Sequence, residues 1–301
     1  MEDQPTDRAR ALVEGAYDLH VHIDPDVIPR RIDDVTLAGR FAEVGLAGFA
    51  LKSHYTSTAE RATVVSGISD VAVIGTLTLN QAVGGMNALA VEIAAREGAR
   101  IVWMPTVDSP AETAGRTEPK PGDKVPLWAR LQHELHGLGL SIEPVHVTDS
   151  EGRLLPETRD VLRAIARHKL ILATGHLARD DAFAVVDAAF EEGVGHVVVT
   201  HPEFPCQDFS IEDQVSLAER GCLVERCLST PLSGKTTWEH VFEGVRAVGV
   251  ERTIFSSDCG NPDYPPVEDG LALWADRLLG AGFDEGEAWR MIVENSRRLA
   301  Q

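Results

Sequence analysis

The segment Tyr17–Ile23, with the sequence YDLHVHI, predicts a buried strand that carries two histidines near its C-terminal end. His20 and His22 alternate with apolar residues, and the pair Asp24–Pro25 then ends the strand. Side chains at positions i and i+2 of a strand point to the same side. We therefore expect both imidazoles to face one region at the end of this strand.

Seven more apolar segments follow along the chain, most of them rich in β-branched residues. They are GFALKSH (48–54), VAVIGTLTL (71–79), RIVWMPTV (100–107), LILATGH (170–176), HVVVTH (196–201), CLVERCL (222–228) and TIFSSD (253–258). Near-continuous apolar runs are typical of parallel strands buried on both faces. Helical patterns that stop at a glycine lie between them, for example Arg179–Gly193, Ser210–Gly221 and Thr236–Gly249.

Eight strand–helix units predict an α/β fold, namely a (β/α)8 TIM barrel that forms a single domain over residues 1–301. An open, doubly wound sheet is the structural alternative. The interval from Thr106 to His176 is 70 residues, against 25 from His176 to His201. Residues 108–157 therefore form an insertion after strand 4, with a short helix near 127–135 and a hairpin over 141–157. Because such insertions lie on the catalytic face, we expect a lid, with an unstructured surface loop as the alternative.

The charge of the chain limits its partners. It has 28 basic and 47 acidic residues, a formal charge of −19, which disfavours nucleic acid and anionic membranes and leaves a small-molecule substrate. An anionic substrate would need local positive charge in the site. The sequence contains no apolar run of membrane-spanning length, its first residues are polar, and its four cysteines are sparse. We expect free thiols and a cytoplasmic protein; a homo-oligomer remains open.

Metal-binding side chains stand at the predicted ends of four strands. They are His20 and His22 on strand 1, His176 on strand 5, His201 on strand 6 and Asp258 on strand 8. Pro202 favours an extended backbone at His201. Imidazole and carboxylate ligands suit zinc, and also iron, manganese or nickel. The pattern predicts a divalent metal site, with one or two ions, at the C-terminal rim of the barrel.

This arrangement resembles the amidohydrolase superfamily over residues 17–299. The resemblance lies in the HxH of strand 1, the histidines that end strands 5 and 6, the aspartate that ends strand 8, and the last helical segment EGEAWRMIVENSRRL (285–299). The chain looks like the compact, barrel-only branch, and the motifs LKSHYTST and TGHL resemble an uncharacterised bacterial group. The resemblance implies that His20, His22, His176 and Asp258 hold a metal. His201 would bind a second metal or polarise the substrate carbonyl.

One feature of the superfamily is missing. Members with two metals have a carbamylated lysine or a glutamate on strand 4, whereas here that strand ends in MPTVD, with Asp108 as its one acid. Lys52 and His54 end strand 2 with i, i+2 spacing and are predicted to contact substrate. Lys52 either anchors a carboxylate or phosphate or is carbamylated and bridges two metals.

Two further residues are candidates for substrate contact. Arg226 lies near the end of strand 7, and His146 lies in the predicted hairpin of the insertion.

The predicted function is hydrolysis of an amide, lactam, lactone or related bond by a metal-activated water. Asp258 would transfer the proton and His201 would stabilise the oxyanion, so these two are the candidate catalytic residues. A metal-dependent decarboxylase or hydratase of a small carboxylated compound is one alternative. A non-catalytic metal-binding barrel is the other.

Overall fold

A computed structural model describes residues 4–114, 127–140, 142–207 and 209–301. Eight parallel strands form one sheet in the order of the chain. Their bounds are β1 Tyr17–Val21, β2 Gly48–Leu51, β3 Ala72–Thr78, β4 Ala99–Trp103, β5 Ile171–Ala173, β6 His196–Val199, β7 Leu223–Cys227 and β8 Thr253–Ser256. Backbone hydrogen bonds from Asp258 N to His20 O and from His22 N to Cys259 O join the last strand to the first. The predicted (β/α)8 barrel is confirmed, and the open sheet is excluded.

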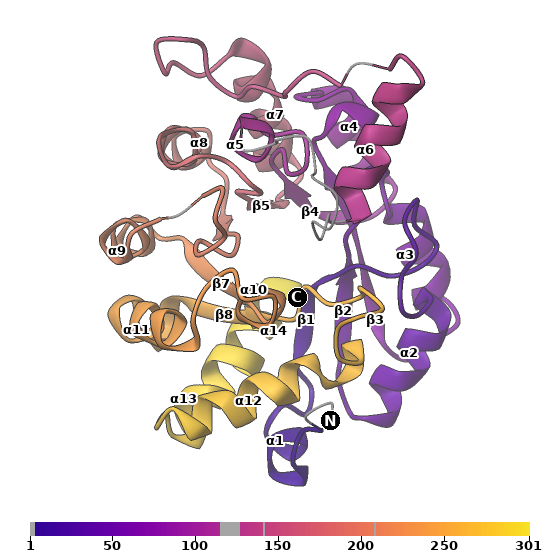
Figure 1. Ribbon diagram of the computed structural model, residues 1–301, viewed down its shortest axis with the longest axis vertical. Coiled ribbons are helices and arrows are strands. Elements are labelled where there is room, and N and C mark those ends of the chain that lie inside the picture. The colour runs from indigo at the N-terminus through magenta and orange to yellow at the C-terminus, as the bar shows by residue number, and fades with distance from the viewer. Residues whose placement is uncertain (1–3, 115–126, 141, 208) are drawn as a thin grey trace.

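Helices surround the strands as a ring (Figure 1). The α-helices are α1 Asp7–Leu12, α2 Asp34–Glu43, α3 Ala59–Ser66, α4 Ala88–Arg96, α5 Pro110–Ala114, α6 Leu127–Gly137, α7 Pro156–Arg167, α8 Arg179–Glu191, α9 Ile211–Glu219, α10 Ser229–Leu232, α11 Trp238–Val248, α12 Gly270–Gly280, α13 Glu285–Trp289 and α14 Asn295–Ala300. The short 3-10 segments are η1 Gln81–Val83, η2 Val250–Arg252 and η3 Val267–Asp269, and the π-helical segment is η4 Arg290–Glu294. Among the described residues, no helix is long and apolar enough to cross a membrane.

The barrel interior is filled by apolar side chains. Leu19, Ile101, Trp103 and Ile254 belong to one buried cluster there, and Leu299 of α14 packs against it. Two larger clusters fill the layer between the strands and the helices. A barrel packed in this way is a solid core, so chemistry is confined to its rim.

The insertion between β4 and β5 contains α5 and α6, and α7 follows it. Gln132 of α6 donates a hydrogen bond to Asp108 Oδ1 (2.7 Å), which fastens this helix to the end of β4. The hairpin predicted over 141–157 is reduced to a single antiparallel bridge between Thr148 and Leu154, with residue 141 outside the described part. The polar stretch 115–126 also lies outside the described residues, so a lid remains a proposal.

Candidate metal centre

Five imidazoles form a closed ring at the C-terminal rim. Successive ring centroids are 5.4 Å apart for His20 and His22, 4.7 Å for His22 and His54, and 6.3 Å for His54 and His176. The ring closes through His176 and His201 (5.0 Å) and through His201 and His20 (5.9 Å). All five residues are buried. Residues from four strand ends, up to 181 positions apart in the sequence, therefore meet in one place.

Asp258 joins two of these histidines. Its Oδ1 atom lies 3.1 Å from His20 Nε2 and 3.2 Å from His22 Nε2, and its Oδ2 atom accepts a hydrogen bond from Ser229 Oγ (2.6 Å). Donor atoms of His20, His22 and Asp258 all lie within 4.8 Å of one another. Two imidazole nitrogens and one carboxylate oxygen in this arrangement suit a divalent metal.

Carboxylates fix the orientation of two imidazoles. His20 Nδ1 lies 3.3 Å from Glu225 Oε2, and His176 Nδ1 lies 3.1 Å from Glu112 Oε2. Because an ionised carboxylate only accepts hydrogen bonds, each Nδ1 carries the proton. When the imidazole is neutral, its Nε2 therefore has the lone pair, which is the form that binds a metal.

Gln207 holds His201 in the same way. Its amide group donates to the backbone oxygens of Gly175 (2.9 Å) and Thr200 (3.1 Å), so its Oε1 atom is the acceptor that faces His201 Nδ1 at 2.9 Å. His201 Nδ1 therefore carries the proton, and Nε2 has a lone pair to offer. This geometry favours His201 as a metal ligand, since a neutral imidazole in this tautomer has no proton on Nε2 for an oxyanion.

Two of the candidate ligands have a strained backbone. His201 has φ 24° and Asp258 has φ 49°, both in the left-handed region that non-glycine residues rarely adopt. The extended conformation predicted for His201 from Pro202 is therefore wrong: tertiary contacts override the preference that the proline imposes. Strain of this kind is typical of functional sites, where the fold holds a side chain in a required direction.

The neighbouring glycines are required for close packing. Gly175 has φ 61°, and a Cβ atom there would lie 2.4 Å from Met104 O. Gly260 has φ 132°, and a Cβ atom there would lie 1.5 Å from His22 O. Glycine thus lets the chain approach the rim closely beside His176 and Asp258.

Burial controls the charge state of the site. It places the pKa values of His22, His54 and His201 well below the usual range, so these imidazoles are neutral at pH 7. Burial alone would raise the pKa of Asp258, but the charges and hydrogen bonds of His20 and His22 hold it well below its usual range. Burial and the charge of Lys52 lower the pKa of His20, but Asp258 and Glu225 outweigh them, so its pKa lies above the usual value and metal binding would release its proton.

Lys52 lies at the centre of the histidine ring. Its Nζ atom is 2.9 Å from His20 Nε2 and 5.1 Å from the centroid of the Trp103 ring, and the residue is 3% exposed. Burial lowers its pKa, with Asp258 and Glu225 opposing the shift. Its charge in turn disfavours protonation of the imidazoles around the ring.

His54 is the member of the histidine ring that lies between His22 and His176. Its Nδ1 atom is 2.8 Å from Thr106 Oγ1, and that hydroxyl already accepts a hydrogen bond from Asn80 Nδ2 (2.7 Å). The hydroxyl proton is thus available to His54 Nδ1. This arrangement favours a proton on His54 Nε2, so His54 is a hydrogen-bond donor where His201 is not.

Two residues predicted to contact substrate lie elsewhere. Arg226 points away from the rim into the helix layer, where its guanidinium pairs with Glu203 and Gln214 and is fully buried. Its neighbour on β7, Glu225, takes the inward position, because successive strand side chains alternate. His146 is exposed and has no contact with the histidine ring among the described residues.

Glu112, Gln207 and Ser229 were not predicted from the sequence. Glu112 lies in α5, within the insertion, and a polar segment of this kind gives no sign of which acid turns inward. Gln207 and Ser229 lie beyond the ends of β6 and β7, by eight and two residues, so no strand periodicity marks them. Asp108, the acid noted at strand 4, instead accepts hydrogen bonds from Gln81 N and Gln132 Nε2.

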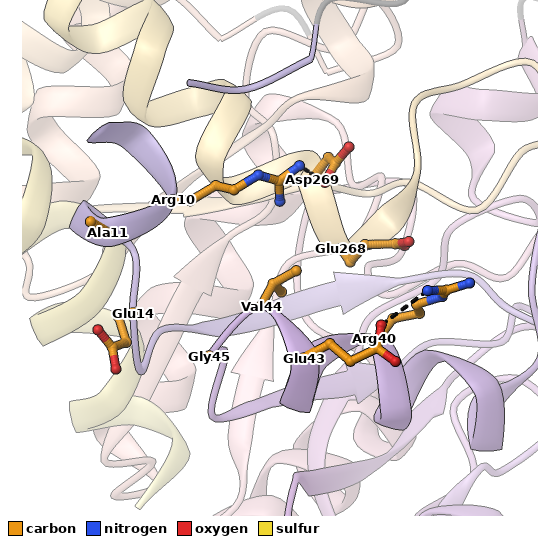
Figure 2. Close-up of a pocket in the computed structure, with 9 residues that line it drawn as sticks. All are labelled: Arg10, Ala11, Glu14, Arg40, Glu43, Val44, Gly45, Glu268 and Asp269. Carbon is orange, nitrogen blue, oxygen red and sulfur yellow. Dashed lines mark hydrogen bonds and ion pairs between the residues drawn. The ribbon is translucent and has the colours of Figure 1, made fainter. Parts of the chain in front are cut away.

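A separate hollow of about 570 Å³ lies between α1, the end of α2 and the segment before α12 (Figure 2). Arg10 pairs with Asp269 across it (2.8 Å), and Arg40 pairs with Glu43 on its edge (3.0 Å). No histidine or cysteine lines it, so it has none of the chemistry of the rim.

The chain matches a known protein family over most of its length. Residues 15–225 match the model described as "Family of unknown function (DUF6282)". The chain belongs to this family. No curated protein matches it in sequence.

Solved structures share the fold of this family member. An amidohydrolase from Pseudomonas aeruginosa has a TM-score of 0.61 at 11% identity, covering 97% of each chain. The probable dipeptidase PvdM from the same organism has a TM-score of 0.63 at 11% identity, covering 97% of this chain and 96% of its own. A mutant organophosphorus hydrolase from Deinococcus radiodurans has a TM-score of 0.55 at 14% identity, covering 100% and 98%. The resemblance to amidohydrolases is thus supported at the level of the fold.

Proposed function

We propose that this protein is a metal-dependent hydrolase of a small molecule with an amide, lactam, lactone or related bond. The observation that carries the proposal is the convergence of His20 Nε2 and His22 Nε2 on one oxygen of Asp258, within a closed ring of buried imidazoles. The amidohydrolase and the organophosphorus hydrolase that share this barrel support the reaction class.

The donor set fits a divalent metal, with zinc as the first choice. His20, His22 and Asp258 would hold it, and His176 and His201 offer free Nε2 atoms on the other side of the ring. Such a metal activates water and polarises a carbonyl group. An ionised Asp258 beside the neutral imidazole of His22 is consistent with this chemistry.

The protein's own groups would carry the proton transfers. Asp258 accepts a proton from the attacking water through its carboxylate and donates it to the leaving group. Ser229 keeps the carboxylate in place through its hydrogen bond to Oδ2. His54, with its proton on Nε2, donates a hydrogen bond to the carbonyl oxygen as negative charge develops there. The oxyanion role first assigned to His201 thereby passes to His54.

Lys52 must change its contact when a metal binds. An ammonium group that donates to His20 Nε2 occupies the lone pair that a metal would use. Either Lys52 turns to a substrate carboxylate, or its neutral amine attacks CO2, forms an N–C bond and loses one proton to become a carbamate. A carbamate would supply the anionic ligand that strand 4 lacks.

A lyase acting on a carboxylated compound is the second candidate function, and the position of Lys52 favours it. A carboxylate held by Lys52 would lie next to His20, where its carbon–carbon bond could break. In a hydrolase, by contrast, the product takes its new oxygen from water.

The test begins with the metal content of the purified protein, measured by elemental analysis. The loaded protein is then assayed with amides, lactams, lactones and small carboxylates in water labelled with ¹⁸O. We expect bound metal, activity that is lost on chelation and restored by zinc, and ¹⁸O in the product. Release of CO2 without ¹⁸O incorporation would establish the lyase instead. Bound metal with no turnover of any compound would favour a non-catalytic barrel.

Carbamylation of Lys52 has its own test. The protein is equilibrated with ¹³C-bicarbonate and examined by ¹³C NMR, with Lys52→Arg as the control. A carbamate signal that is absent from the control assigns the bridging role. The same spectrum from both proteins leaves Lys52 as a substrate anchor.

A further inference from the structure

A second cation lies at the mouth of the site, farther out than Lys52. Lys235 is in the loop between α10 and α11, and its Nζ atom lies 3.8 Å from the centroid of the Phe204 ring. The same ring packs against two members of the histidine ring, with centroids 5.1 Å from His176 and 4.8 Å from His201. Phe204 therefore links Lys235 to the metal-binding residues within the length of one small molecule.

Lys235 has no ion pair with any residue that the structure describes. The two carboxylates whose charges act on Lys235 already have partners: Glu112 is bound by His176, and Asp258 is bound by His20 and Ser229. Lys235 is exposed, and the charges of Asp258 and Glu112 act on its ammonium group, which places it within electrostatic reach of the site. Its charge is therefore free to bind an anion from solution.

The other cations near the ring are not free in this way. Arg30 lies beside His22, but Asp26 pairs with it at 2.7 Å and both side chains are buried. Lys52 lies deeper, against His20 and the Trp103 ring, so an anion bound to it would lie among the metal-binding residues. In a protein with a formal charge of −19, Lys235 is, among the described residues near the ring, the cation best suited to an incoming anion.

We propose that the substrate carries a carboxylate group that Lys235 binds, with the Phe204 ring holding the ammonium group in position. This inference rests on the proposed function, because it assumes that the reacting bond lies over the histidine ring. A single lysine balances the single charge of a carboxylate. A phosphate monoester carries more charge and is typically bound by arginine or by several backbone N–H groups.

The carboxylate would serve for recognition and not for reaction. Lys52 contacts His20 directly, whereas Lys235 contacts the outer residue Phe204. A carboxylate at Lys235 thus leaves the rest of the substrate to reach the metal-binding residues. The substrate class is a small monocarboxylic acid with a second, hydrolysable group.

The test measures the preference of the metal-loaded full-length protein for a carboxylate over its neutral amide. Calorimetric titrations with benzoate and benzamide, and with acetate and acetamide, give this preference for the wild type and for Lys235→Met. Lys235→Arg keeps the charge. Lys169→Met is the matched control, because Lys169 is an exposed lysine at the opposite end of the barrel, before β5.

We expect the wild type to bind benzoate more tightly than benzamide by about tenfold to a hundredfold, the range for a hydrogen bond to a charged group. Lys235→Met should lose this preference with unchanged benzamide binding, and both Lys235→Arg and Lys169→Met should keep it. An unchanged preference in Lys235→Met, or none in the wild type, would overturn the inference.

Metal content measured on the same samples separates the two proposals. Metal-loaded protein without a carboxylate preference rejects the role of Lys235 and leaves the proposed function intact. Wild-type protein that binds no metal rejects the proposed function itself.

Discussion

The two sides of the histidine ring are built differently. On the β1–β8 side, His20 and His22 share a carboxylate, Asp258, which lies inside the ring and contacts both Nε2 atoms. On the β5–β6 side, His176 and His201 have their acceptors, Glu112 and Gln207, behind them on Nδ1.

This difference predicts where a metal would bind first. The β1–β8 side has a complete set of two nitrogens and one anionic oxygen, so it can hold a metal by itself. The β5–β6 side offers two neutral nitrogens and needs a further donor, such as a carbamate on Lys52 or the substrate. We therefore expect one tightly bound metal and a second, weaker site.

The largest expected effect comes from removing each pair of histidines in turn. His20→Ala with His22→Ala should lose all tightly bound metal and all activity, whereas His176→Ala with His201→Ala should keep the tightly bound ion. Both proteins should stay folded, because the barrel core is formed by other residues. Elemental analysis and circular dichroism provide the measurements. Equal metal loss in the two double variants would remove the distinction between the sides.

Asp258→Asn separates metal binding from proton transfer. The amide oxygen can still coordinate, so much of the metal should remain, but an amide cannot accept the proton of water at neutral pH. We expect kcat to fall by about 10²–10⁴-fold, the usual range for general-base assistance. Metal content, melting temperature and kcat are measured on one preparation. Near-normal turnover in the loaded variant would move the base to another residue.

Glu112→Gln tests the hydrogen bond that orients His176 on the β5–β6 side. Loss of the carboxylate behind His176 should weaken the second metal site by about 10- to 100-fold, as is typical for such partners, and leave the first site unchanged. Glu92→Gln is the matched control, since Glu92 forms a similar pair with His168 (2.8 Å) on the outer helices. Metal titrations of both variants give the two affinities. A loss of the tightly bound ion in Glu112→Gln would show that the sides are not independent.

The smallest effect is expected for Ser229→Ala. Its hydroxyl donates to Asp258 Oδ2, and a donor to the charged form of a carboxylate lowers its pKa. Without this bond the pKa of Asp258 should rise, so activity should be lost at a higher pH on the acidic side of the pH–rate profile. The decrease in kcat at neutral pH should be smaller than in Asp258→Asn. A profile that matches the wild type would show that Ser229 has no part in positioning Asp258.

The barrel was predictable because its signal is local. Each buried strand shows its apolar run, and helices such as Arg179–Gly193 and Ser210–Gly221 match α8 and α9 closely. The placement of His20, His22, His54, His176 and His201 on one rim follows from parallel strands alone. The extended backbone expected at His201 was wrong because local preference is weak against the packing of a rim loop.

The side chains that support the metal-binding residues were not predictable in the same way. Arg226 and Glu225 are neighbours on β7, and only the pleat of the finished barrel decides that Glu225 turns inward to His20 while Arg226 pairs with Glu203. Glu112 reaches His176 from an insertion whose path has no period that could be followed in the sequence.

The sequence by itself determined the eight strands, their order and the set of metal-binding side chains at their ends, because strand periodicity and connection length act over short distances. Only the tertiary structure decided which nitrogen of His176 and His201 is free, which carboxylate lies inside the ring and which lysine forms no ion pair with a described residue. These properties depend on hydrogen bonds between residues far apart in the chain, such as His176 with Glu112 and His20 with Glu225. Such contacts exist only after the barrel has closed.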